Sequence, residues 1–255
     1  MKAAYIEENG GPDVLKYGDL PDPIAKPGEV FGYHADTAYF YGVMPWLLTN
    51  GASTLSGDWS KATVDTPAAI EAATFARSLV EQNISPRPGG QFDAYTALAQ
   101  GKLGMFAAGW WPHVNMSQLN FTDKVKIVTF PKRTQLGSPV GWTLYPMFKA
   151  SKNKDAGWEL IKFISSKAVN RIFAKGGPAL PIRKSIVLSK EVLSQGPKGT
   201  ERLYEALDYA TPIPAPSSLA LIQPDIEDTW SQILLGNVTA EAGLRDLNQR
   251  IQSNL

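Results

Sequence analysis

The sequence contains no cysteine and only two histidines, His34 and His113. Without thiols, structural disulfides and thiolate chemistry are excluded, and cysteine usage says nothing about the redox compartment. A clustered-histidine site or a catalytic zinc set also lacks its ligands. We therefore expect no metal and no cofactor.

Long apolar runs and an excess of one charge are missing too. No stretch approaches the roughly 20 apolar residues that span a bilayer. The opening run MKAAYIEENGG lacks the apolar core of about 7–15 residues that a secretory signal needs, so the chain as written is expected to stay in the cytoplasm. The 25 basic and 24 acidic residues nearly cancel, which gives no electrostatic reason to expect nucleic acid or an anionic membrane as partner.

The 255 residues are enough for one large domain or two lobes, and 44% apolar content supports a real core. Aromatic residues are frequent, with seven Trp, nine Tyr and ten Phe. Several of them stand beside Gly, Pro or Asn, where loops and the ends of elements are expected. Exposed aromatic rings are therefore the first candidates for a ligand site.

The first 30 residues predict a hairpin and an extended linker. A strand over 2–7, a turn at 9–12 and a return strand over 14–17 are followed by prolines at 21, 23 and 27. The run MKAAYIEENGGPDVLKYGDLPDPIAKPGEV resembles the opening strands of a medium-chain quinone oxidoreductase or zinc-type alcohol dehydrogenase. From Phe31 onward nothing resembles that family.

The rest of the chain alternates helical patterns with a few apolar strands, which predicts an α/β architecture. The clearest helix starts after Thr66-Pro67, an N-cap followed by proline at the first helical position. The helices are expected over 35–49, 67–81, 92–100, 155–164, 168–175, 201–209 and 225–235, with a last one capped by Thr239. The strands are expected over 103–108, 125–130 and 140–148.

Several blocks after residue 31 resemble, in order, an extracellular solute-binding protein that feeds sugars to an ABC transporter. They are ATVDTPAAIEAATFARSLVEQNISP, FDAYTALAQGKLGMFAAGWWP, VKIVTFPKR, GWTLYPMFKASKNKDAGWELIKFISS, KGGPALPIRKS and LGNVTAEAGLRDLNQRI. Each block is loose, but their order over most of the chain is specific. The resemblance covers the C-terminal two-thirds of a family 1 member.

This resemblance implies an incomplete periplasmic-binding-protein-like fold of type II. Residues 31–134 and 186–255 would form the C-terminal lobe, and residues 135–185 an excursion into the N-terminal lobe. A full member carries a signal sequence and most of the N-terminal lobe before this point, and it is periplasmic or extracellular. Its ligand lies between lobes that close about a hinge. A truncated, fused member would bind sugar weakly or not at all.

The implied function is the carbohydrate-binding component of an ABC sugar transporter, with the transporter's membrane subunits as partners. One alternative is a recombined or engineered remnant that binds nothing. The other is a quinone oxidoreductase-like enzyme, which lacks the G-x-G-x-x-G fingerprint of a dinucleotide site. No pair of acids suggests a glycosidase, and His113 has no visible nucleophile partner, so we expect no enzyme.

Flat aromatic faces are what a sugar-binding site needs. The candidates are Trp110, Trp111, Trp142, Tyr41, Tyr39, Trp46 and Trp230. Adjacent residues at a strand end point to opposite sides, so one of Trp110 and Trp111 can be buried while the other faces a ligand. Trp230, at helical spacing with Ile226 and Ile233, fits a core position as well as a ligand platform.

Polar candidates are fewer. Asp36 and Asp93 could accept hydroxyl protons from a sugar, but acids near helix starts are usually caps or solvated. The excursion carries apolar residues evolved to pack on an absent lobe: Leu160, Ile161, Ile164, Ile172 and Phe173. An exposed patch of this kind predicts self-association of the chain.

Overall fold

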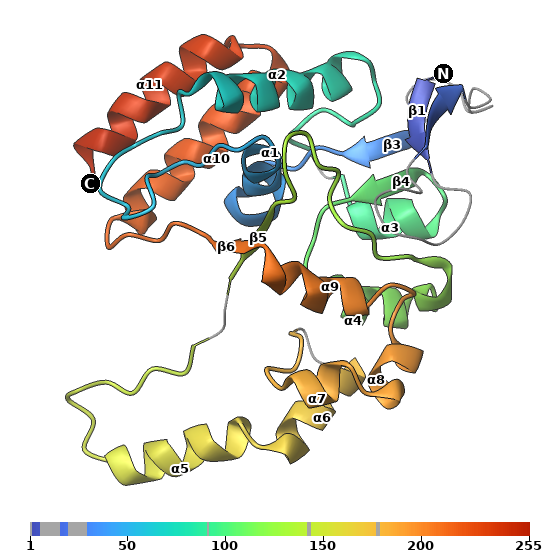
Figure 1. Cartoon of the computed structure of the whole chain (residues 1–255), viewed down its shortest axis with the longest axis vertical. Helices are drawn as coiled ribbons and strands as arrows, with labels where there is room; N and C mark the ends of the chain where they lie inside the picture. Colours follow the sequence, from blue (N-terminus) through green and yellow to red (C-terminus); the bar gives the residue numbers. More distant parts are fainter. Residues whose placement is uncertain (1, 6–15, 20–29, 91, 142–143, 177–178) are drawn as a thin grey trace.

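The computed structural model describes residues 2–5, 16–19, 30–90, 92–141, 144–176 and 179–255. Three two-stranded sheets and a set of helices make up this part (Figure 1). The strands are β1 (Lys2–Tyr5), β2 (Lys16–Asp19), β3 (Phe31–His34), β4 (Leu103–Phe106), β5 (Ser138–Val140) and β6 (Ala210–Pro212). The α-helices are α1 (Met44–Thr49), α2 (Pro67–Glu81), α3 (Ala94–Ala99), α4 (Pro112–Gln118), α5 (Lys154–Ile164), α6 (Lys167–Gly176), α7 (Lys184–Val187), α8 (Lys190–Gln195), α9 (Glu201–Glu205), α10 (Leu219–Leu235) and α11 (Ala240–Ser253).

The largest core lies between α1, α2, α10 and α11, which stack side by side in Figure 1. Local sequence explains why these helices form where they do. The Thr66 hydroxyl accepts the Ala69 N–H at the start of α2, as predicted, and Thr239 caps α11 in the same way. Gly236 ends α10 with a φ of 80°, a left-handed cap that favours glycine.

The apolar stripes of these helices face one another. They contribute Ala69, Ala73, Ala76 and Val80 from α2, Ile222, Ile226, Trp230 and Ile233 from α10, and Leu244, Leu247 and Ile251 from α11. Trp230 is only 1% exposed, so it is a core residue. Burying side chains of this size stabilises the fold by about 1.5–3 kcal/mol each.

The N-terminal hairpin forms as expected: β1 and β2 pair antiparallel, with Lys2 opposite Asp19 and Tyr5 opposite Lys16. The predicted turn at 9–12 lies outside the described residues. The other two sheets are parallel, because β3 pairs with β4 and β5 pairs with β6.

Two strand predictions are wrong for the residues that the structure describes. Residues 125–130 form a single bridge, from Lys126 to Lys198, because no neighbouring strand supplies a ladder. The expected strand over 140–148 shrinks to β5, which ends at Val140, and residues 144–148 are irregular.

Several helix predictions need corrected boundaries. The helix expected over 201–209 is α-helical only as far as Glu205 and ends in a 3-10 turn at Ala206–Asp208. The helix expected over 35–49 begins with a π-turn at Tyr39–Val43, where the Val43 N–H reaches back to the Ala38 carbonyl, and continues as α1. The helix expected over 225–235 starts six residues earlier, at Leu219, and contains Pro224. Its buried residue Ile222 anchors this extra turn in the core.

Helices α5 to α8 lie apart from the α2–α10–α11 layer, at the opposite end of the molecule (Figure 1). They have a small core of their own, made by Ala174, Ile186 and Val192. No residue of α5 is buried. The division into a lobe of 31–134 with 186–255 and an excursion of 135–185 stays a prediction, although Ile186 and Val192 pack with α6 rather than with the main core.

Candidate functional site

A cavity of about 160 Å³ lies where the π-turn, the start of α3 and the residues after β4 meet. Its lining combines five aromatic side chains with two carboxylates, one imidazole and three alanines. The residues are His34, Asp36, Tyr41, Phe92, Asp93, Ala94, Tyr95, Phe106, Ala107, Ala108 and Trp111. We call this group the aromatic cavity.

Trp111 forms one wall of the aromatic cavity. Its ring centroid lies 5.4 Å from that of Tyr41 and 6.1 Å from that of Phe40. Gly109 makes this orientation possible, because a Cβ at that position would overlap the six-membered ring of Trp111. The Tyr41 hydroxyl is a hydrogen-bond donor at neutral pH, and burial raises its pKa further above the ordinary value of 10.

Further aromatic rings line the same cavity. Phe92 contacts His34 with centroids 5.1 Å apart, and Tyr95 meets Phe106 edge-on at 5.5 Å. Rings held in this way by their neighbours form a rigid apolar surface. Phe92, Tyr95 and Phe106 were missed as site residues, because their spacing fits ordinary packing at the start of α3 and the end of β4.

The two carboxylates of the cavity already accept hydrogen bonds from neighbouring backbone N–H groups. Asp36 Oδ1 accepts the Ala38 N–H at 2.8 Å, and its Oδ2 lies 3.7 Å from His34 Nδ1. Asp93 caps α3 by accepting the Tyr95 N–H and the Thr96 hydroxyl, and this hydroxyl lowers its pKa. Both acids therefore act as caps or turn formers, yet each keeps oxygens that can accept a ligand hydroxyl.

Burial lowers the pKa of His34, although the nearby Asp36 carboxylate opposes this shift. A neutral imidazole can both donate and accept a hydrogen bond. Among the described residues no group of three or more His, Asp or Glu could hold a metal ion. The cavity therefore offers rings and neutral or acidic hydrogen-bonding groups, which suit a polar, uncharged ligand.

The other predicted site residues take different positions. Trp110 is 5% exposed and stacks on His113, with centroids 4.4 Å apart and an angle of 26°. Tyr39 is buried, and its hydroxyl pairs with Thr54 at 2.7 Å. Burial raises its pKa to about 12. Trp142 lies outside the described residues.

Of the predicted site residues that the structure describes, Trp111, Tyr41, Asp36 and Asp93 are brought together in the aromatic cavity. Trp230 is in the core, and Trp46 packs edge-on against Tyr33 and Phe130 at the margin of that core. Of the two adjacent tryptophans, Trp110 is buried and Trp111 lines the cavity.

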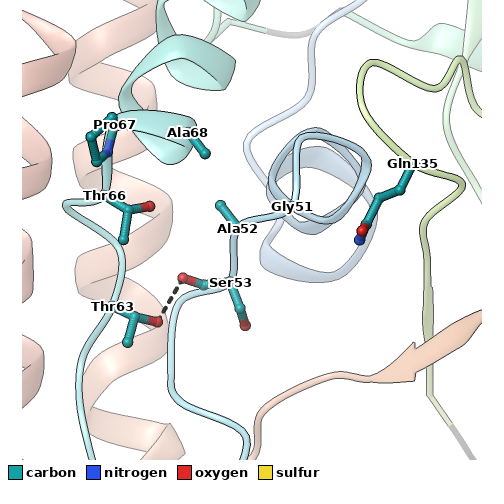
Figure 2. Close-up of a pocket in the computed structure, with 8 residues that line it drawn as sticks. All are labelled: Gly51, Ala52, Ser53, Thr63, Thr66, Pro67, Ala68 and Gln135. Carbon is teal, nitrogen blue, oxygen red and sulfur yellow. Dashed lines mark hydrogen bonds between the residues drawn. The ribbon is translucent and has the colours of Figure 1, made fainter.

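A second, larger cavity of about 510 Å³ lies beside the start of α2. Figure 2 shows its lining, which is Gly51, Ala52, Ser53, Thr63, Thr66, Pro67, Ala68 and Gln135. Apart from Pro67 and Gln135, these residues are small or hydroxyl-bearing, and the Thr63 hydroxyl donates a hydrogen bond of 3.0 Å to the Ser53 carbonyl. Since this lining offers neither an aromatic ring nor a charged side chain, we base the functional argument on the smaller cavity.

The sequence matches the family model "Bacterial extracellular solute-binding protein" over residues 2–198. The chain belongs to this family. The match begins before residue 30, and no comparison supports an oxidoreductase segment there. Solute-binding proteins are not enzymes, which agrees with the sequence prediction. No described helix is long and apolar enough to cross a membrane.

Solved structures of solute-binding proteins share the fold. They include an ABC substrate-binding protein of Listeria monocytogenes in complex with cycloalternan (21% identity, TM-score 0.73, 88% of this chain and 58% of that one). A maltose-bound protein of T. maritima, MalE3, gives 20% identity and a TM-score of 0.74, over 89% of this chain and 61% of that one. The maltose-maltodextrin binding protein of Alicyclobacillus acidocaldarius gives 20% identity and a TM-score of 0.70, over 89% of this chain and 63% of that one.

These matches confirm the predicted fold class, an α/β periplasmic-binding-protein-like fold that is incomplete. The chain spans about 58–63% of the length of these structures. At about 20% identity the likeness establishes the fold alone, so the ligand has to be argued from the aromatic cavity.

Proposed function

We propose that the chain is the sugar-binding component of an ABC transporter, and that the aromatic cavity forms one face of its ligand site. The observation that carries the proposal is the pairing of Trp111 with Tyr41 in a cavity that also contains the Asp36 carboxylate. Aromatic faces stack on the C–H side of a pyranose ring, and carboxylates accept its hydroxyls. The matched structures include complexes with maltose and cycloalternan, which are carbohydrates.

The volume of the aromatic cavity bears on the expected affinity. At about 160 Å³ it is smaller than the roughly 300–1,000 Å³ of typical ligand pockets. A face of this size would contact one side of a sugar ring. We therefore expect millimolar affinity at best, about −4 kcal/mol, for the chain by itself. The membrane subunits of a transporter remain the proposed protein partner.

Titration calorimetry of the chain against glucose, maltose and maltotriose tests the proposal. Heats of binding that saturate and that disappear in a Trp111→Ala variant support it. Micromolar binding that survives this substitution would place the ligand elsewhere. No heat with any sugar would favour the alternative of a non-binding, recombined remnant.

A further inference from the structure

The charged side chains that line the aromatic cavity all have the same sign at neutral pH. Of its eleven lining residues, Asp36 and Asp93 are carboxylates and none is Lys or Arg. His34 is neutral at this pH, because burial lowers its pKa below the ordinary value of 6.5. The lining therefore carries a net charge of −2, one from each carboxylate, although the whole chain carries +1.

Neither carboxylate has its charge cancelled by a neighbour within the part of the chain that the structure describes. Asp36 Oδ2 lies 3.7 Å from His34 Nδ1, which is too far for a hydrogen bond, and Oδ1 accepts only the Ala38 N–H. Asp93 accepts a backbone N–H and a hydroxyl of α3, and both donors are neutral. Hydrogen bonds of this kind hold the two carboxylates in place but leave their negative charge to act on a ligand.

The negative potential extends to the aromatic wall of the cavity. Burial raises the pKa of the Tyr41 hydroxyl most, and electrostatic interactions with Asp36, Tyr95 and Glu227 raise it further. Glu227 lies on α10 and is not among the lining residues, so it adds to the charge that acts on Tyr41 from outside the lining. A positive charge on a ligand is therefore favoured at this wall.

An uncharged sugar meets this environment only in part. It displaces water from the carboxylates and provides hydroxyl hydrogen bonds, but it provides no opposite charge. A protonated amine provides charge-assisted hydrogen bonds, which are shorter and stronger than neutral ones. The faces of aromatic rings attract an ammonium group as well, and five aromatic side chains line the same cavity. The rings and the carboxylates therefore favour the same chemical group.

We propose that the sugar preferred by the aromatic cavity is an amino sugar, whose protonated amine interacts with Asp36 and Asp93. This inference rests on the proposed function, because Trp111 and Tyr41 would stack on the sugar ring. A metal ion fits less well, since the described residues form no group of three or more His, Asp or Glu. An amine without a sugar ring would leave the stacking surface of Trp111 unused.

Titration calorimetry of the 255-residue chain at about pH 7 and low salt tests the proposal. The ligands are glucose, N-acetylglucosamine and two amino sugars, glucosamine and 6-amino-6-deoxyglucose. N-acetylglucosamine carries a neutral amide where glucosamine carries its amine. We expect at least one amino sugar to bind about fivefold or more tightly than glucose, since each exposed pair of opposite charges contributes up to about fivefold. Salt at about 0.5 M should reduce this preference, because it screens exposed charges.

Two conservative substitutions remove the charges separately. Asp36→Asn and Asp93→Asn should each lower the preference for the amine about two- to fivefold, and the double variant should bring it close to one. Asparagine also accepts backbone N–H groups in turns and at helix N-caps, so both local structures should persist. Asp155→Asn is the matched control, because Asp155 is exposed on α5, which lies apart from the main core (Figure 1). Circular dichroism checks that each variant folds.

The outcomes separate this inference from the proposed function. Equal affinities for glucose and both amino sugars, all lost in Trp111→Ala, would overturn the inference and leave the sugar-binding function intact. No heat with any of the four ligands would overturn both. An amine preference that persists in the double variant would overturn the inference too, because its charge would come from another part of the chain. Equal binding of N-acetylglucosamine and glucosamine, with 6-amino-6-deoxyglucose no better than glucose, would show that the size of the substituent is recognised rather than its charge.

Discussion

The backbone N–H of Tyr39 donates a hydrogen bond of 2.9 Å to the carboxylate of Glu227, which is 188 positions away in the sequence. The bond ties the π-turn next to the aromatic cavity to α10. Gln223 donates to the same oxygen at 2.9 Å. The position of Tyr41, two residues after Tyr39, therefore depends on a helix near the other end of the chain.

Replacing Glu227 by Ala should destabilise the fold by about 1–3 kcal/mol, because the Tyr39 N–H loses its acceptor in a partly buried place. Asp228→Ala is the control, since Asp228 is exposed one position further along α10. Urea denaturation compares the two variants with the parent. A loss no larger than that of the control would show that water replaces the carboxylate.

Trp111→Ala should weaken sugar binding by about 2 kcal/mol or more, the usual effect of removing a central aromatic anchor. Trp158→Ala is the matched control, because its ring is exposed far along the chain from the cavity. Trp110→Ala should act differently: it leaves a void beside His113 and Gly196 and should cost about 3–5 kcal/mol of stability. Calorimetry measures the sugar affinity and thermal unfolding measures the stability. If Trp110→Ala weakened sugar binding and Trp111→Ala only destabilised the fold, Trp110 would be the ligand-binding ring.

Gly109→Ala should reduce sugar affinity without removing any ligand-contacting atom. The added methyl group overlaps the Trp111 ring, so the ring has to leave its place next to Tyr41. Gly57→Ala is the control, because a Cβ there meets no atom within 4 Å. Equal affinity of the two variants would show that the orientation of Trp111 does not matter.

Acid should destabilise the protein through His113. Burial lowers the pKa of this imidazole below its ordinary value of 6.5, and its Nδ1 has no hydrogen-bond partner. Below pH 6.5 the unfolded chain binds a proton that the folded chain does not, so stability falls as the pH falls through that value. Above it, both states are neutral and the effect vanishes.

The measurement is thermal unfolding of the parent and His113→Gln between about pH 5 and 8. The variant should lose part of the slope below pH 6.5, whatever its absolute stability. His34 contributes a slope of the same sign, because burial lowers its pKa as well, against the opposing effect of Asp36. Parallel curves for parent and variant would assign the acid sensitivity to other groups.

The chain should neither bind NADPH nor reduce quinones. The sequence lacks a glycine fingerprint for a dinucleotide, and its family match includes the segment that resembles an oxidoreductase. Saturable quenching of tryptophan fluorescence by NADPH, together with turnover of a quinone, would contradict this expectation.

Features that depend on a few neighbouring residues could be predicted from the sequence. Thr66-Pro67 fixes the start of α2, because both the cap and the proline act within one turn. The apolar stripes of α2 and α11 predicted the buried faces in the same local way. The order of loosely similar blocks predicted the solute-binding fold, which the family match and the solved structures confirm.

Other features required the tertiary structure, because they depend on contacts between distant segments. A strand needs a partner, so the apolar run at 125–130 remained a single bridge. From the sequence alone, either Trp110 or Trp111 could be the buried ring. In the structure Trp110 packs against His113 and Gly196, whereas Trp111 contacts Tyr41 and lines the cavity.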